Sequence, residues 1–160
     1  MYTKGTTLLL DFGTFNHYGI SDGCGGVIHN SKKYRMVTHE SEADFAEGKD
    51  IIVSDITSNN PCYAFDKAKR YIGMGYDLLQ SNCEHFIRLC HGLEVESTQI
   101  QKYLLASATA GVALKSNNSI VKMASIAASL AALITPKEES PFKNAAIAAL
   151  VTAGVMMAVR

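Results

Sequence analysis

The sequence predicts an α+β fold followed by a helical region rich in small residues, on the strength of three observations. Two short runs with strand character, residues 15–20 and 26–30, flank a segment dense in turn formers and indicate a β-hairpin. Residues 60–73 and 81–92 each begin with capping residues and end at glycine, which is typical of helices. From about residue 103 the composition shifts to alanine and other small or apolar residues. The class is therefore mixed, with a separate helical end.

The segment after the hairpin predicts a short helix and then a strand. SEADFAEG, residues 41–48, begins with Ser41 at an N-cap position, has Asp44 three residues later and ends at a glycine. DIIVSDI, residues 50–56, follows as a strand rich in β-branched residues.

Residues 60–73 carry the clearest helix signals in this half of the chain. Asn60 supplies a cap, Pro61 suits the first helical position, and Gly73 ends the run. The apolar positions at helical spacing are Phe65, Ala68 and Ile72.

The next predicted helix places a cysteine in its first turn. Ser81 and Glu84 fit the capping-box pattern, in which the serine caps the helix and the glutamate reaches back. Cys83 then lies in the first turn, and Gly92 ends the helix. Glu84 and Arg88 form a favourable pair four residues apart.

The length and charge of the chain limit the functions to be expected. A chain of 160 residues suits one core domain with an appendage. Fifteen Lys and Arg balance 15 Asp and Glu, and the only basic cluster is Lys32, Lys33 and Arg35, so nucleic-acid binding is not expected. The first residues reach Asp11 before any apolar run long enough for a signal peptide, which predicts an intracellular, cytoplasmic protein.

The cysteines are expected to be free thiols, and no metal or cofactor is expected. Cys24, Cys62, Cys83 and Cys90 show no C-x-x-C spacing, and no H-E-x-x-H motif accompanies them. The glycine-rich stretches SDGCGG and GMG lack the lysine and hydroxyl residue of a phosphate loop, so they are expected to be turns.

Cys83 is the candidate nucleophile. A first-turn cysteine faces unpaired N–H groups and the positive end of the helix dipole, which lower a thiol pKa. His17 and His29 stand directly opposite each other if the hairpin turn is centred on Gly23, so one could orient the other. The alternatives are an inert, packed cysteine and partly exposed strand histidines. The remaining histidines, which lack comparable geometry, are His39, His85 and His91.

Two motifs resemble those of the lecithin:retinol acyltransferase family. NCEHF, residues 82–86, is similar to the pentapeptide in which family members place the nucleophilic cysteine. HYGISDGCGGVIH, residues 17–29, is similar to the family's histidine box. The segments between them follow the family order, so the resemblance covers roughly residues 1–103.

The resemblance implies a fold, a site and a chemistry. The fold would be a circularly permuted relative of papain-like peptidases, with an antiparallel sheet packed on the helix that begins at the cysteine. Cys83 would be the nucleophile, His17 the base and His29 the polar third member. Family members take an acyl chain from a phospholipid onto the cysteine and pass it to an alcohol, an amine or water. Nothing in the sequence names the acceptor.

Residues 104–160 form the second predicted region, after a catalytic domain at 1–103. Apolar runs at 119–134 and 144–159 predict a helical hairpin through the polar segment TPKEESP. The last run would extend about 24 Å, less than the roughly 30 Å of a bilayer core. The hairpin could therefore associate with a membrane surface, cover the core or form an oligomer interface.

The leading functional hypothesis is thus a thiol-dependent acyltransferase or phospholipase acting through an acyl-Cys83 intermediate. A cysteine peptidase or amidase with the same triad is the second hypothesis. A membrane-bound interaction or remodelling protein with an idle triad is the third. The sequence leaves the oligomeric state open.

Overall fold

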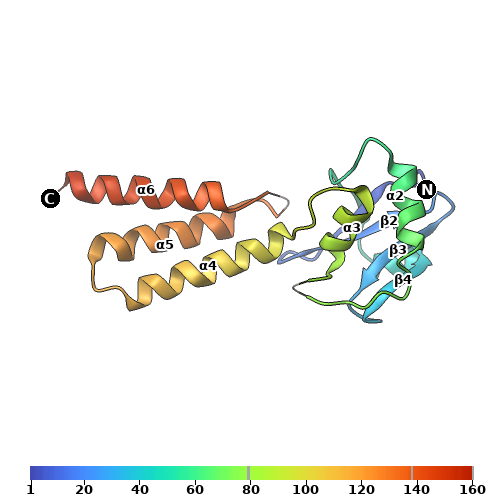
Figure 1. The fold of residues 1–160 in the computed structure, drawn as a ribbon, viewed down its shortest axis with the longest axis horizontal. Helices are drawn as coiled ribbons and strands as arrows, with labels where there is room; N and C mark the ends of the chain where they lie inside the picture. Colours follow the sequence, from blue (N-terminus) through green and yellow to red (C-terminus); the bar gives the residue numbers. More distant parts are fainter. Residues whose placement is uncertain (79, 138, 160) are drawn as a thin grey trace. The chain divides into compact units, whose positions relative to one another are not determined.

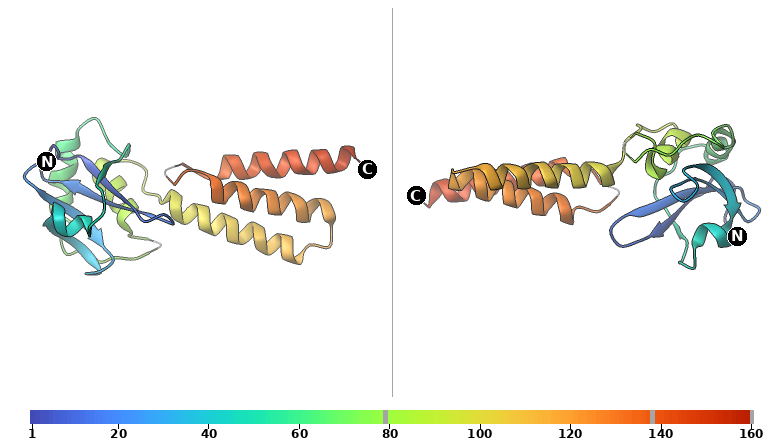
Figure 2. Two further views of the ribbon diagram at one scale, coloured as in Figure 1. Left: turned by 180° about the vertical axis from the view of Figure 1, so that it is seen from behind. Right: turned by 90° about the horizontal axis from the view of Figure 1, so that it is seen from below.

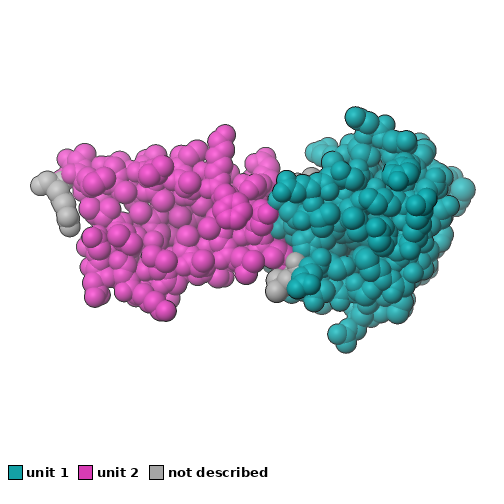
Figure 3. All heavy atoms as spheres, viewed as in Figure 1, with its two compact units in different colours: residues 1–97 teal, residues 98–160 magenta. Residues whose placement is uncertain are grey.

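The computed structural model describes residues 1–78, 80–137 and 139–159. The chain divides into two compact units, Met1–Ser97 and Thr98–Arg160 (Figure 3). The predicted boundary after residue 103 lies six residues further along the chain. Helix α4 (Thr98–Lys115) opens the second unit, and its first turn is polar, so the change in composition lags behind the start of the helix.

The first unit contains a five-stranded antiparallel sheet, which confirms the α+β class (Figure 1). The strand order is β4-β3-β2-β1-β5. The strands are β1 (Thr7–Asp11), β2 (Asn16–Ser21), β3 (Gly26–Ser31), β4 (Met36–Ser41) and β5 (Ile52–Val53). Of the predicted strand at 50–56, Ile52 and Val53 form β5 and pair with Leu9 and Leu8 of β1, and the N–H of Ser54 donates to Thr7. The predicted hairpin is confirmed as β2 and β3.

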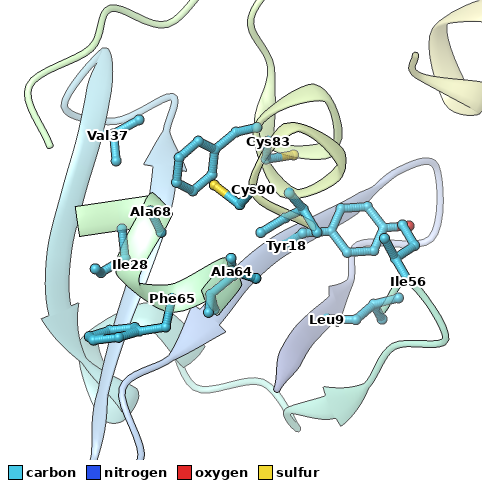
Figure 4. Packing of buried hydrophobic residues seen from close by; sticks show 13 residues of the cluster. Leu9, Tyr18, Ile28, Val37, Ile56, Ala64, Phe65, Ala68, Cys83 and Cys90 are labelled. Atoms are coloured by element: carbon cyan, nitrogen blue, oxygen red, sulfur yellow. The ribbon is translucent and has the colours of Figure 1, made fainter. Parts of the chain in front are cut away.

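Three helices cover the two faces of this sheet. Helices α2 (Pro61–Lys69) and α3 (Cys83–His91) lie on one face, and α1 (Glu42–Ala46) lies on the other (Figure 2). Because successive residues of a strand point to opposite faces, β2 serves both layers. Tyr18 and Ile20 enter the cluster under α2 and α3, and Figure 4 shows Tyr18 together with Cys83 there. Phe45 of α1 packs with Leu8, Leu10 and Val27 on the opposite face.

The register of the hairpin differs from the predicted one. The ladder pairs Ile20 with Ile28 and Ser21 with Val27. The turn is therefore centred on Cys24 instead of Gly23, and in this register His29 falls opposite Gly19. The predicted direct opposition of His17 and His29 is wrong by two residues, although both still lie on the same face as diagonal neighbours.

Two of the three predicted helix caps are present in the structure. Ser41 caps α1 by accepting the N–H of Asp44, and Asn60 caps α2, as predicted. The predicted Ser81 cap of α3 is wrong, because Asn82 caps the helix and forms the capping box with His85. Ile72 lies beyond the end of α2 and is 51% exposed, so it does not join the core.

Glu84 has a different partner set from the one predicted. Its side chain is fully buried and does not reach back to cap α3. It pairs with Arg88 at 3.4 Å, as the spacing predicted, and accepts a hydrogen bond from Ser97 at 2.8 Å.

The second unit consists of three helices, α4, α5 (Ser119–Ile134) and α6 (Phe142–Ala158). Helix α5 packs against both of the others (Figure 1). The predicted hairpin is present as α5 and α6, and residue 138 of its connection lies outside the described part. In the ranges that the structure describes, no helix combines the length and apolarity needed to cross a bilayer.

Gly19 should be intolerant of a side chain. A Cβ atom there would overlap the Val27 side chain and lie 3.0 Å from the Phe45 ring. We expect Gly19→Ala to lower the free energy of unfolding by about 1–3 kcal/mol, since overpacking forces neighbours to move. Urea unfolding followed by circular dichroism measures this. Gly75→Ala is the control, because a Cβ at Gly75 meets nothing within 4 Å; equal stability of the two variants would contradict the packing argument.

Candidate active site

Cys83 opens helix α3 and is buried against strand β2. Its Sγ atom donates to the carbonyl oxygen of Asn16 at 3.7 Å, and the N–H of Tyr18 points back at the sulfur. The side chain is 8% exposed and belongs to the cluster under α2 and α3 (Figure 4). The first-turn position is thus confirmed, and the thiol is packed against the backbone on either side of His17.

The protonation of the thiol departs from the sequence-based expectation. Burial raises the pKa of Cys83 to about 12 and outweighs the helix N–H groups, which lower it. The charged Glu84 side chain next in sequence raises this pKa further. The resting residue is therefore a neutral thiol at physiological pH, and a thiolate requires a base at the moment of reaction.

The two predicted histidines are joined in a hydrogen-bonded chain that continues to Glu40. The Nε2 atom of His17 is 2.8 Å from Nδ1 of His29. The Nε2 atom of His29 is 2.7 Å from Oε2 of Glu40, which neighbours Val27 in the β3–β4 ladder. His29 and Glu40 are mostly buried, with side chains 5% and 14% exposed. Strands β2, β3 and β4 thus each contribute one member.

This chain fixes the protons on both rings. A carboxylate only accepts, so Nε2 of His29 carries a proton and donates it to Glu40. Burial lowers the pKa of His29 despite the opposing effect of Glu40, so the ring is neutral and its Nδ1 accepts from Nε2 of His17. The lone pair of His17 is consequently on Nδ1. A neutral imidazole with a defined lone pair is what a general base requires.

Phe45 covers the histidine pair. The ring centroid of Phe45 is 5.5 Å from that of His17 and 5.1 Å from that of His29. This apolar cover helps exclude water. Burial, and secondly the repulsion between the two rings when both are protonated, lowers the pKa of His17 to about 3. Thiol and imidazole are therefore both held in their neutral forms.

The structure brings His17 and His29 together, and it places Cys83 beside the backbone of His17. Among the described residues no hydrogen bond joins Sγ to an imidazole, because the thiol proton is directed to the Asn16 carbonyl. The thiol reaches β2 from the α2–α3 layer, and the His17 ring lies in the Phe45 layer. The direct Cys83–His17 contact stays a prediction.

The other three histidines have structural partners. His39 contacts Asp22, and His85 belongs to the α3 capping box. The Nε2 atom of His91 is 2.8 Å from the hydroxyl of Thr7, and its Nδ1 atom is 3.0 Å from the hydroxyl of Ser58. Within the described parts of the chain, no three His, Cys, Asp or Glu side chains are arranged to hold a metal ion.

Two residues of the site were missed from the sequence, Glu40 and Phe45. Glu40 stands in an alternating strand segment where a charged residue is expected to face solvent, so only the β3–β4 register reveals it. Phe45 is the one aromatic residue of the predicted helix at 41–48, and this could have indicated that it packs on the sheet. No protein-family model matches the chain, and no curated protein matches it either. The family resemblance therefore rests on the two motifs.

Replacement of Glu40 should change the tautomer of His29. In Glu40→Gln the partner can donate as well as accept, so we expect Nδ1–H forms of His29 to appear and the pKa of His29 to fall further. Long-range proton–nitrogen correlation NMR reports both. Glu47→Gln is the matched control, since Glu47 raises the pKa of His29 through space without a hydrogen bond. Identical spectra of the two variants would refute the role of Glu40.

The lowered pKa of His17 should make the fold sensitive to acid. The unfolded chain protonates His17 below about pH 6.5, whereas the folded chain does so only near pH 3, so stability falls as the pH drops through this window. Each such proton contributes a slope of up to about 1.4 kcal/mol per pH unit. Urea unfolding between pH 4 and 8 should give a shallower slope for His17→Gln than for the native chain below pH 6.5. Parallel curves there would show that His17 is not the sensitive group.

Proposed function

We propose that this chain is a cysteine-dependent acyltransferase or phospholipase that takes an acyl chain from a phospholipid onto Cys83. The observation that carries the proposal is the chain His17–His29–Glu40, with distances of 2.8 and 2.7 Å, beside a cysteine in the first turn of a helix. Polar groups linked in this way are costly to remove from water, and the linkage places a basic lone pair on one nitrogen. The resemblance to the lecithin:retinol acyltransferase family supports phospholipid as the donor.

The first half-reaction needs the thiol proton to leave the Asn16 carbonyl and move to Nδ1 of His17. As it does so, Sγ attacks the ester carbonyl carbon, a C–S bond forms and the carbonyl electrons move to oxygen. The first-turn N–H groups of α3 are suited to stabilise that oxyanion. Collapse breaks the ester C–O bond, and the His17 imidazolium returns its proton to the leaving oxygen. The products are a lysophospholipid and acyl-Cys83.

The second half-reaction releases the acyl chain to an alcohol, an amine or water. His17 takes the proton of the acceptor as the acceptor attacks the thioester carbonyl, and the departing sulfur regains a proton from the imidazolium. During both halves His17 is briefly positive in a buried site. Glu40, linked to it through His29, supplies the compensating negative charge.

An acyl adduct on Cys83 tests the proposal. Intact-protein mass spectrometry after incubation with mixed phospholipid vesicles should show the acyl mass on native protein and none on Cys83→Ala. His17→Ala should slow adduct formation by about 100-fold or more, as expected for loss of a general base. Cys90→Ala is the matched control, because Cys90 is a second buried cysteine on the same helix and should leave the adduct in place.

The remaining outcomes separate the alternatives. Peptide cleavage that depends on Cys83 without lipid turnover would favour a cysteine peptidase or amidase. No adduct with donors of varied chain length would overturn the proposal. It would favour an interaction protein with an idle triad, in keeping with the thiol hydrogen-bonded to the backbone instead of to an imidazole.

A further inference from the structure

The three-helix unit packs with its small residues inside and its large apolar residues outside. The core that joins the helices consists of Ala106, Ala128, Ala132 and Ala145, each at most 6% exposed. In contrast, Leu114 is 84% exposed, Leu150 73% and Leu130 58%. In helical domains that face water on all sides, the large apolar residues are buried and the exposed positions are mostly polar. The unit therefore offers apolar surface that it does not use in its own packing.

The exposed apolar residues form continuous stripes on two helices. On α5 the exposed stripe consists of Met123, Ile126, Leu130 and Leu133. On α6 it consists of Ile147, Leu150, Val151 and Val155. Spacings of three and four residues place each set on one face of its helix. Contiguous apolar surface of this kind marks a contact with a protein or a lipid partner.

Charged residues are confined to the ends of the helices. Residues 103–114, 123–134 and 144–159 contain no Asp, Glu, Lys or Arg. The lysines that flank these ranges are Lys102, Lys115, Lys122 and Lys143. A lysine at the end of an apolar segment can place its stem along acyl chains and its ammonium group among phosphates.

The charge of the unit favours an anionic lipid surface over a second copy. Residues 98–160 contain six Lys and Arg and two Asp and Glu, a net charge of +4, whereas residues 1–97 contain nine and thirteen, a net charge of −4. Two copies joined through the helical unit would oppose equal positive charges. A bilayer with anionic phospholipid supplies hydrocarbon for the stripes and phosphate for the lysines together.

We propose that the helical unit Thr98–Arg160 binds the surface of bilayers that contain anionic phospholipid. The faces of α5 and α6 enter the boundary between headgroups and acyl chains, and Lys115, Lys122 and Lys143 contact phosphates, whereas Lys102 donates to the carbonyl oxygen of Thr135 within the unit. The charge-free ranges of α5 and α6, 123–134 and 144–159, extend about 18 and 24 Å. Both are shorter than the roughly 30 Å of a bilayer core, so the helices lie in the interface. The proposal does not depend on the chemistry at Cys83.

Sedimentation with vesicles tests the proposal on the full-length Cys83→Ala chain, in which acyl transfer cannot change the lipid. The chain should sediment with phosphatidylcholine vesicles that contain phosphatidylserine and far less with phosphatidylcholine alone. Leu130→Gln with Leu150→Gln should weaken binding roughly tenfold for each side chain. Lys115→Gln, Lys122→Gln and Lys143→Gln together should weaken binding to the anionic vesicles by about 100-fold.

Matched controls come from the first unit. Tyr63→Gln with Ile72→Gln replaces two residues that are 55% and 51% exposed there. Lys32→Gln, Lys33→Gln and Lys49→Gln remove the same number of charges. Both control sets should bind like the parent chain, and circular dichroism checks that every variant is folded. A parent chain left in the supernatant, or one bound equally by neutral vesicles, would overturn the proposal. A third outcome is a dimer that does not bind vesicles. If the two leucine replacements dissociate that dimer, the apolar face would belong to an interface with a second copy of the chain.

Discussion

The carboxylate of Asp22 holds the turn on which the candidate active site depends. Its Oδ1 atom accepts the N–H groups of Cys24 and Gly26 at 2.6 and 2.8 Å. These bonds fix the number of residues in the turn, and that number fixes which residues of β2 and β3 are neighbours. A slip of one residue would turn every side chain of one strand to the other face. The contact between His17 and His29 therefore exists only because the turn has this length.

Burial is the second constraint, and it favours the neutral form of both reactive groups. Removal of water raises the pKa of the Cys83 thiol and lowers that of the His17 imidazole, so neither is charged at rest. A thiolate–imidazolium pair of the kind used by many cysteine enzymes is disfavoured here. In the proposed reaction the proton moves while the C–S bond forms, and Glu40, linked to His17 through His29, balances the transient imidazolium.

The features that could be predicted from the sequence are those decided within a few residues along the chain. The cap at Ser41, the hairpin strands and the first-turn position of Cys83 all belong to this group. Asn82 caps α3 in place of Ser81 because the backbone of Ser81 is bridged to that of Asp77 and its carbonyl oxygen also accepts from Asn30 of β3, a distant segment. Glu40 was missed for the same reason, since its partner lies 11 residues away on another strand.

The packing of Cys83 also bears on how the protein meets oxidants. Peroxides attack thiolates, and the rate follows the thiolate fraction and the access of the reagent to sulfur. Cys83 is buried and protonated, whereas Cys24 and Cys62 are exposed. Mild oxidation would therefore reach the two surface thiols first. The residue proposed to carry the acyl group would stay reduced until a substrate draws its proton away from the Asn16 carbonyl.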